Sequence, residues 1–131
     1  MILGGGVGGT IVANVLAKKA KGAEVTVVDR TGKHVYQPGF VYVAFDKMRP
    51  EKLVRDERKL LRRRVKLLID EAVRVDDAAK EVHLKSGAVL AYDYLVIATG
   101  SRLAPDELPG ATLGYHIYSA EGAMRLREAL G

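Results

Sequence analysis

The stretch Gly4-Gly5-Gly6-Val7-Gly8-Gly9 follows the apolar residues Met1-Ile2-Leu3 and has the form G-x-G-x-x-G. In a turn between a strand and a helix, this pattern binds the pyrophosphate of a dinucleotide. Gly4 would permit the tight turn, Gly6 would let the pyrophosphate approach the backbone, and Gly9 would let the helix pack closely on the strand. A helix that starts near Val7 or Gly8 directs free N–H groups and the positive end of its dipole toward the phosphates.

The residues after the glycines complete a strand–helix–strand unit over residues 1–30. We expect a helix from about residue 7 to residue 20, with four apolar residues at helical spacing on its buried face: Ile11, Val12, Val15 and Leu16. The β-branched run 24–29 predicts the second parallel strand. Asp29 ends that run, 20 residues after Gly9, where a carboxylate accepts hydrogen bonds from a ribose. Arg30, beside it, leaves a 2′-phosphate open as an alternative.

The net charge of +5 is concentrated between residues 51 and 66, which hold eight basic and three acidic side chains. A basic helix can bind nucleic acid or an anionic membrane surface. Because no aromatic residues alternate with the arginines, as base stacking would require, we interpret 51–64 as a solvated basic helix and expect no nucleic-acid partner. The acidic pair Asp56-Glu57 is interpreted as part of that solvated surface, and His34 as an ordinary surface or packing residue.

The rest of the chain predicts further strands and one more helix. Residues 31–50 are expected to be irregular, and the extended stretches within 65–92 predict a three-stranded antiparallel meander. Residues 93–100 contain the apolar run Leu95-Val96-Ile97-Ala98, which is typical of a core strand buried on both faces. A loop over 101–114 would lead to a helix over 119–130, capped by Ser119.

Composition limits the class of protein. With 131 residues, 48% apolar content and a mean hydropathy near zero, we expect one globular domain over residues 1–131. The absence of cysteine excludes disulfides, thiolate metal sites and cysteine redox chemistry within this sequence. The three histidines share no metal-ligand spacing, so we expect no metal site. No apolar run approaches the roughly 18 residues of a membrane span, and no stretch resembles a secretory signal, so a cytoplasmic location is expected.

The order of these segments resembles the flavin-binding domain of the pyridine nucleotide-disulfide oxidoreductase superfamily. A long connection and a meander precede the strand that ends in Ala98-Thr99-Gly100. Within the superfamily, Asp29-Arg30, the segment His34-Val35-Tyr36-Gln37-Pro38 and residues 92–101 look most like sulfide:quinone oxidoreductases. The flavoprotein of flavocytochrome c sulfide dehydrogenase and type II NADH dehydrogenases are close relatives of these. The resemblance implies an α/β fold: a Rossmann-like FAD/NAD(P)-binding domain with a parallel sheet, helices and a three-stranded antiparallel meander.

The resemblance also implies FAD as the cofactor and assigns roles to residues. The glycine turn would hold the FAD pyrophosphate, Asp29 would bind the adenosine ribose, and Arg30 would lie along the adenine. Ala72 would contact the adenine through its backbone, while Thr99 and Gly100 would lie against the flavin. Gln37 and Pro38 occupy a loop that lies near the ribityl chain and the ring in relatives. The expected cofactor-binding residues are Gly4, Gly6, Val7, Gly8, Gly9, Asp29, Arg30, Gln37, Ala72, Thr99 and Gly100. No residue of this chain is assigned a catalytic role.

Members of the superfamily are much longer than this chain, and their flavin domain is discontinuous. The segment that binds the ribityl–phosphate end of FAD, a second dinucleotide domain, redox cysteines and membrane-docking helices lie beyond the part that this sequence resembles. We therefore expect an N-terminal, truncated portion of such an enzyme. Apolar surface left exposed would favour a homo-oligomer, with the last helix or the meander in the interface. Membrane contact is expected only in the longer members.

Two functions remain open for the dinucleotide site, beside a third hypothesis, that the basic helix binds nucleic acid or an anionic surface. The first is the FAD-binding N-terminal portion of a sulfide:quinone oxidoreductase-like enzyme, in which electrons pass from sulfide or NADH through FAD to quinone. The second is a stand-alone module that binds a dinucleotide or ADP without redox activity. Their relative affinities for ADP, NAD and FAD would distinguish them.

Overall fold

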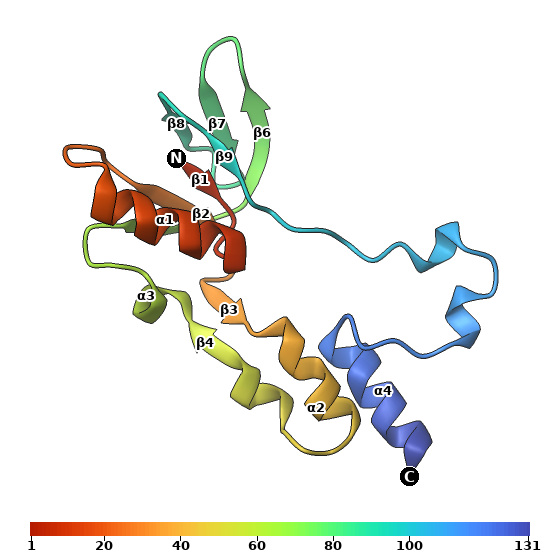
Figure 1. Cartoon of the computed structure of the whole chain (residues 1–131). Coiled ribbons are helices and arrows are strands. Elements are labelled where there is room, and N and C mark those ends of the chain that lie inside the picture. Colours follow the sequence, from red (N-terminus) through yellow and green to blue (C-terminus); the bar gives the residue numbers. More distant parts are fainter. The chain divides into compact units, whose positions relative to one another are not determined.

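The computed structural model describes residues 1–131, apart from the side chain of Asp106 (Figure 1). The chain forms two compact units, one made of residues 1–34 and 56–100 and the other of residues 35–55 and 101–131. The structure thus contains two compact units. That residues 1–131 form one domain stays a prediction. Within the described part of the chain, no helix is both long and apolar enough to cross a membrane.

The first unit is built on a four-stranded parallel sheet. In spatial order its strands are β5 (Lys66–Ile69), β2 (Thr26–Asp29), β1 (Ile2–Leu3) and β9 (Val96–Ile97). Ile2 pairs with Val27 on one side and with Val96 on the other, so the two-residue strand β1 lies in the interior of the sheet. Because β1 leads directly into the glycine turn, this central position places the turn at the carboxyl edge of the sheet.

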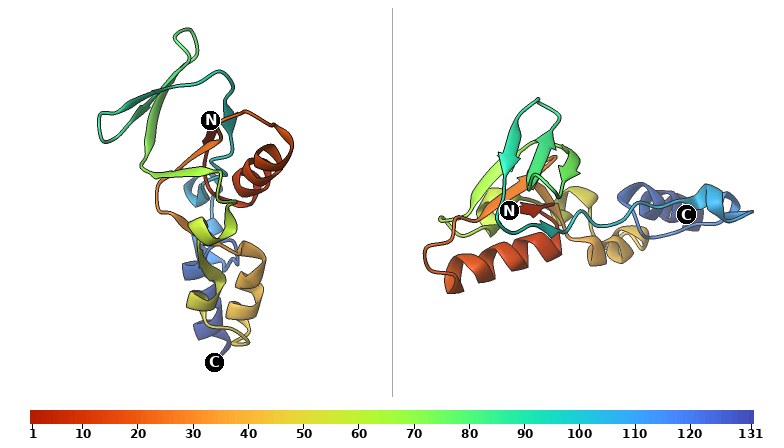
Figure 2. Two further views of the ribbon diagram at one scale, coloured as in Figure 1. Left: turned by 90° about the vertical axis from the view of Figure 1, so that its left-hand side faces the viewer. Right: turned by 90° about the horizontal axis from the view of Figure 1, so that it is seen from above.

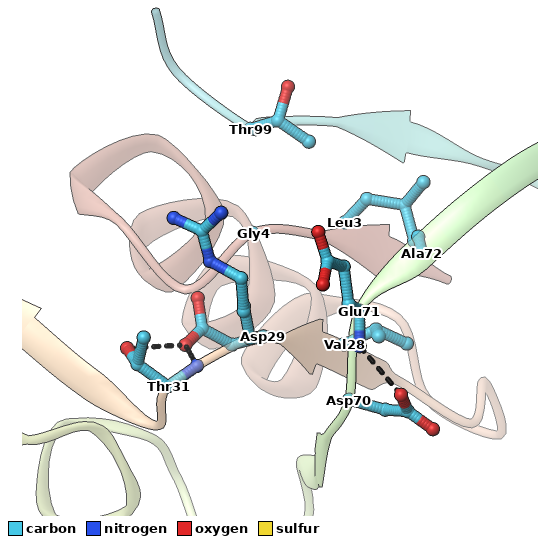
Figure 3. Close-up of a pocket in the computed structure, with 10 residues that line it drawn as sticks. Leu3, Gly4, Val28, Asp29, Thr31, Asp70, Glu71, Ala72 and Thr99 are labelled. Carbon is cyan, nitrogen blue, oxygen red and sulfur yellow. Dashed lines mark hydrogen bonds between the residues drawn. The ribbon is translucent and has the colours of Figure 1, made fainter. Parts of the chain in front are cut away.

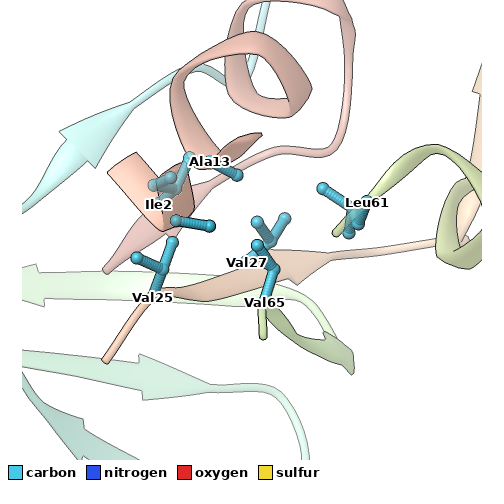
Figure 4. Packing of buried hydrophobic residues seen from close by; sticks show 7 residues of the cluster. Ile2, Ala13, Val25, Val27, Leu61 and Val65 are labelled. Carbon is cyan, nitrogen blue, oxygen red and sulfur yellow. The ribbon is translucent and has the colours of Figure 1, made fainter. Parts of the chain in front are cut away.

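Alternation along the strands separates two cores on the two faces of the sheet. Helix α1 (Val7–Lys19) covers one face, where Ala13 packs with Ile2, Val27 and Val65 (Figure 4). The neighbouring strand residues Leu3 and Val28 point to the other face and pack against the antiparallel meander. The meander consists of β6 (Ala72–Asp76), β7 (Glu81–Leu84) and β8 (Val89–Ala91). Figure 2 shows the resulting order of layers, helix, parallel sheet and meander. The predicted Rossmann-like fold class is therefore confirmed.

Helix α1 forms where the sequence predicts it, but it buries a different face. Ile11 and Val15 are 57% and 46% exposed, and the buried residues are Gly9, Thr10, Ala13 and Ala17. The predicted buried face over Ile11, Val12, Val15 and Leu16 is therefore wrong, although Val12 does pack at the edge of the core. The physical reason is close approach: small side chains spaced four residues apart let the helix lie near the sheet, and this sets its rotation.

The segment 65–75 is divided between the two sheets. The prediction assigned all of residues 65–92 to the meander, but β5 pairs in parallel with β2 over Thr26–Asp29 and belongs to the main sheet. The chain turns at Asp70-Glu71, where Glu71 N donates to the Asp70 carboxylate at 2.7 Å. Only β6, β7 and β8 form the meander. The alternation within 65–75 did not distinguish one long strand from two strands in different sheets.

The expected continuous basic helix over 51–64 is wrong. That region forms a 3₁₀ turn (Pro50–Leu53), strand β4 (Val54–Asp56) and the single-turn helix α3 (Glu57–Leu60). Asp56 stops the preceding strand by accepting a hydrogen bond from Arg58 N, as a helix cap does. The Arg58 guanidinium then donates to the carbonyls of Leu61, Arg62 and Val65. These bonds satisfy backbone groups that a longer helix would have satisfied internally.

The expectation that residues 93–100 form a core strand buried on both faces is also wrong. Strand β9 covers only Val96–Ile97 and lies at the edge of the sheet, with β1 as its one neighbour. Ile97 is 68% exposed. An apolar run alone does not show whether a strand lies at the centre or at the edge of its sheet, because both positions can carry the same residues.

The second unit holds the remaining helices. Helix α2 (Phe40–Ala44) packs against α4 (Ala120–Leu130) through Phe40, Val43 and Ala123. The predicted cap is confirmed, since Ser119 Oγ accepts a hydrogen bond from Gly122 N at 3.0 Å. Strand β3 (Lys33–Val35) pairs with β4 and leads into this unit. It also contains 3₁₀ turns at Gln37–Gly39, Pro50–Leu53, Pro105–Glu107 and Ala111–Leu113.

Candidate dinucleotide-binding site

The glycine turn joins β1 to α1, and two of its glycines are required by steric fit. Gly4 has φ +99°, and a Cβ there would overlap the carbonyl group of Ala98. A Cβ on Gly9 would overlap the carbonyl oxygen of Gly4. The turn is also fastened to the neighbouring strand, because Gly4 N donates to Val28 O at 2.8 Å. Any larger residue at position 4 or 9 would displace the start of the helix from the sheet.

The outer side of the turn has the properties of an anion site. Gly6, Val7 and Gly8 are exposed, and a Cβ on Gly6 would meet no atom within 4 Å. Gly6 is the N-cap of the 13-residue helix α1, and among the described side chains none caps this end. The N–H groups of the first turn therefore have no carbonyl partner within the helix and carry the positive end of its dipole. Exposed glycine backbone at such an end can approach a phosphate closely.

Asp29 holds the turn from the carboxyl end of β2. Its Oδ2 accepts a hydrogen bond from Gly5 N at 2.8 Å, and its Oδ1 accepts from Thr31 N at 2.9 Å and Gly32 N at 2.7 Å. Partial burial alone would raise the pKa of Asp29, but the hydrogen bonds from Gly5, Thr31 and Gly32 outweigh it and hold the pKa below its ordinary value of 3.8. Asp29 is therefore a carboxylate at neutral pH, with acceptor capacity left mainly on Oδ2.

A cavity of ≈ 260 Å³ opens beside the turn (Figure 3). Its volume is below the roughly 300–1,000 Å³ typical of pockets for complete drug-sized ligands, so it suits one end of a dinucleotide. It is lined by Leu3, Gly4, Val28, Asp29, Arg30, Thr31, Asp70, Glu71, Ala72 and Thr99. Five of the residues predicted from the sequence are thus brought together: Gly4, Asp29, Arg30, Ala72 and Thr99.

The remaining predicted residues lie outside the cavity lining. Gly6, Val7, Gly8 and Gly9 form the turn and the first turn of α1, next to Gly4. Gly100, with φ +73°, follows Thr99 but does not line the cavity. Gln37 begins the 3₁₀ turn Gln37–Gly39 of the second unit. The assignment of all these residues to cofactor binding stays a prediction.

Two acidic residues of the cavity were missed by the sequence interpretation. Asp70 and Glu71 follow β5 directly and line the cavity together with Asp29, so its lining holds three acidic residues and one basic residue, Arg30. These two residues could not be predicted because the sequence pattern does not show that β5 pairs in parallel with β2. Once β5 is assigned to the main sheet, its carboxyl end lies at the edge where ligands of such sheets bind.

A buried carboxylate behind the turn was also missed. Glu57 is 0% exposed, so its interpretation as part of a solvated surface is wrong. Thr10 Oγ1 donates to Glu57 Oε1 at 2.7 Å, and His34 Nδ1 lies 3.2 Å from Glu57 Oε2. The basic residues around Glu57 in the sequence gave no indication of this, because its partners lie 47 and 23 residues away.

Comparison with known proteins gives one consistent result. The family model described as "Pyridine nucleotide-disulphide oxidoreductase" matches residues 1–130. The mitochondrial sulfide:quinone oxidoreductase of Dictyostelium discoideum is 31% identical over 84% of this chain, which spans 25% of that protein. The crystal structure of the sulfide:quinone oxidoreductase from Aquifex aeolicus superposes with a TM-score of 0.79 at 26% identity, covering 98% of this chain and 30% of that one. An NAD-dependent persulfide reductase from A. fulgidus superposes with a TM-score of 0.68 at 28% identity, covering 97% of this chain and 26% of that one. The chain therefore spans about a quarter to a third of the length of these proteins.

Proposed function

Because the chain belongs to the pyridine nucleotide-disulphide oxidoreductase family, we propose that it binds the ADP part of FAD and serves as the cofactor-binding portion of a flavin-dependent oxidoreductase. The proposal rests on two features that lie next to each other. One is the N-terminus of α1, which none of the described side chains caps, and the other is a cavity of ≈ 260 Å³, a size that suits one end of a dinucleotide. The exposed backbone of Gly6 to Gly8 offers N–H donors, and the cavity beside Gly4 is bordered by the ionised carboxylate of Asp29.

Each part of the site has a distinct task in this proposal. The N–H groups of Gly6, Val7 and Gly8 donate to pyrophosphate oxygens, and the dipole of α1 stabilises their charge. Asp29 Oδ2 accepts a hydrogen bond from a ribose hydroxyl with the capacity that Gly5 leaves free. Arg30, which follows β2, and Ala72, the first residue of β6, both line the cavity and would contact the base. Thr99, Gly100 and Gln37 are proposed to lie toward the flavin end.

The proposal extends to the reaction of the whole enzyme, and this part is drawn from the names of the relatives. A bound FAD would supply two-electron redox chemistry. Relatives named for sulfide, quinone and NAD lead us to propose electron transfer from sulfide or NADH to a quinone by the whole enzyme. This chain's residues bind and orient the cofactor, and none is assigned a role in the transfer itself.

The alternative is a stand-alone module that binds ADP or a dinucleotide without redox activity. It is favoured by the size of the cavity, which suits the adenosine end and not a complete FAD. In that case ADP or NAD would bind more tightly than FAD.

Calorimetry on the 131-residue chain with ADP, FAD and NAD tests these proposals. We expect FAD to bind at least as tightly as ADP and more tightly than NAD, since all three ligands share the ADP part and only FAD can also reach Thr99 and Gly100, the residues proposed to lie toward the flavin end. The variant Gly6→Glu serves as the control: it places a carboxylate at the anion site while nothing within 4 Å opposes its Cβ. Absence of binding for all three ligands contradicts both functions, and NAD binding more tightly than FAD contradicts the first.

A further inference from the structure

Glu57 has a carboxyl group in the buried interior, where the hydrophobic effect alone favours an apolar side chain. Of the described side chains, it and Thr10 are the two buried polar residues. Removing a carboxyl group from water costs several kcal/mol unless partners compensate, and a well-packed apolar residue is often as stable in such a position. Stability alone therefore gives no reason for a carboxylate here, and its contacts must be considered.

The partners of Glu57 converge on one carbonyl group of the glycine turn. Thr10 Oγ1, which donates to Glu57, also lies 3.0 Å from Gly5 O and 2.9 Å from Gly6 O. His34 Nδ1, which faces Glu57 Oε2, lies 3.1 Å from Gly5 O. The Cγ and Cδ atoms of Glu57 would lie 3.1 Å from a Cβ on Gly5, so the side chain fills the space directly behind the turn.

The direction of the Gly5 carbonyl fixes the direction of the next N–H group. The peptide bond between Gly5 and Gly6 is trans and planar, so its C=O and N–H point in opposite directions. With Gly5 O held against Thr10 and His34, the Gly6 N–H must point away from them, toward the exposed side of the turn. That side is where the pyrophosphate lies in the proposed function.

Counting protons shows what Glu57 adds. The Thr10 hydroxyl has one proton and His34 Nδ1 carries at most one, so two donors serve four acceptor oxygens: the carbonyls of Gly5 and Gly6 and both oxygens of Glu57. Glu57 gives the hydroxyl and the imidazole ring a second, rigid attachment. Its own backbone is fixed in turn, because Glu57 N donates to Gly32 O at 2.9 Å. Without the carboxylate, both donors lose the group that sets their position behind Gly5.

We propose that Glu57 is a positioning residue of the dinucleotide site: through Thr10 and His34 it orients the Gly5–Gly6 peptide so that the Gly6 N–H faces the pyrophosphate. This inference rests on the proposed function, since it assigns Glu57 a role in the same site. Glu57 itself is fully buried and makes no contact with the ligand.

Two matched pairs of variants test it by calorimetry with ADP and by thermal unfolding. Glu57→Leu and Thr10→Val remove the polar contacts at similar volume, and we expect ADP to bind about tenfold more weakly, as for one misdirected charge-assisted hydrogen bond. Glu57→Gln and Thr10→Ser retain an acceptor or a hydroxyl, and we expect affinities within about twofold of the parent. In Glu57→Leu the midpoint of unfolding should stay close to that of the parent chain, because an apolar residue can replace a buried carboxylate without loss. Thr10→Val should lower the midpoint as well as the affinity, because it takes a hydrogen-bond donor away from the buried carboxylate.

A second measurement does not depend on ligand binding. In ¹⁵N–¹H spectra of the ligand-free chain, Glu57→Leu and Thr10→Val should shift the Gly6 and Val7 amide resonances. Thr26→Val, the same chemical change on β2, should leave them in place. If the parent chain binds no ADP, the proposed function fails while this measurement still decides the orientation of the turn.

Three results would overturn the inference: parental ADP affinity in Glu57→Leu, a loss of affinity in Glu57→Leu that is accompanied by a matching fall of its unfolding midpoint, or unchanged Gly6 and Val7 resonances. Should Glu57→Leu fail to fold, the comparison of Thr10→Val with Thr10→Ser decides between the outcomes.

Discussion

Gly6 and Gly9 belong to one glycine pattern, but the structure requires them for opposite reasons. A Cβ on Gly9 would overlap the carbonyl oxygen of Gly4, whereas a Cβ on Gly6 would point into open space. Gly6 also has φ −68°, a value that any L-residue adopts. Glycine at position 9 therefore serves the fold, and glycine at position 6 leaves room for something outside the protein.

This difference predicts opposite phenotypes for two equal substitutions. Gly9→Ala should destabilise the chain by about 1–3 kcal/mol, because the methyl group has no space in a close-packed contact. Gly6→Ala should leave the unfolding midpoint unchanged and weaken ADP binding, because the methyl group occupies the phosphate side. Urea unfolding followed by circular dichroism, together with calorimetry, measures both. Normal ADP affinity in a folded Gly6→Ala variant would contradict the placement of the pyrophosphate.

Asp29 makes a second prediction at this scale. In Asp29→Asn the N–H groups of Gly5, Thr31 and Gly32 lose a charged acceptor, which should cost about 1–3 kcal/mol. Since folding lowers the pKa of Asp29, its contribution is present above the ordinary value of 3.8 and is lost as the pH falls through the lower pKa of the folded state. Urea unfolding of both proteins near neutral pH and below pH 3.8 checks this, because the difference between them should shrink in acid. A difference that is constant with pH would exclude the charge as its cause.

At the scale of elements, the sequence predicted what depends on neighbours in the chain. The glycine turn, the position of Asp29 and the Ser119 cap need only residues within one strand–helix–strand unit or one helical turn. The face of α1 and the burial of Glu57 could not be predicted this way, because both depend on contacts with residues far along the chain. The same holds for β5, whose membership in the parallel sheet depends on pairing with β2.

Arg58 shows how one side chain can stabilise a loop where the sequence predicts a longer helix. Its guanidinium donates to three backbone carbonyls of the loop between α3 and β5, at Leu61, Arg62 and Val65. Arg58→Lys should destabilise the chain by about 1–3 kcal/mol, since an ammonium group cannot reproduce the planar fork of donors. The control is Arg63→Lys, the same change at an exposed residue of that loop, which should have an effect within about 0.5 kcal/mol. Urea unfolding of both variants measures the difference, and equal effects would refute the assigned role of Arg58.

At the scale of the whole molecule, the exposed apolar surface leads us to propose self-association. The meander has β6 at its edge, with unpaired backbone groups along one side, and Val73 on this strand is 60% exposed. Leu130 at the end of α4 is 58% exposed. An edge strand with an exposed apolar side chain can pair with another chain, and the two charged residues of β6, Arg74 and Asp76, form an ion pair with each other at 3.2 Å, so they leave no net charge to oppose this pairing. We therefore expect the meander edge to provide the interface between two copies.

Sedimentation velocity over a range of protein concentrations tests this, with one lysine substitution on each surface. The parent chain should show a mass that rises with concentration. Val73→Lys should shift the distribution toward the monomer, because a charge on the edge strand cannot be buried between two copies without a partner. Leu130→Lys, an equal change at the end of α4, should have little effect if the meander edge is the interface, and the reverse pattern would assign the contact to α4. A single monomeric species at every concentration would exclude self-association through either surface.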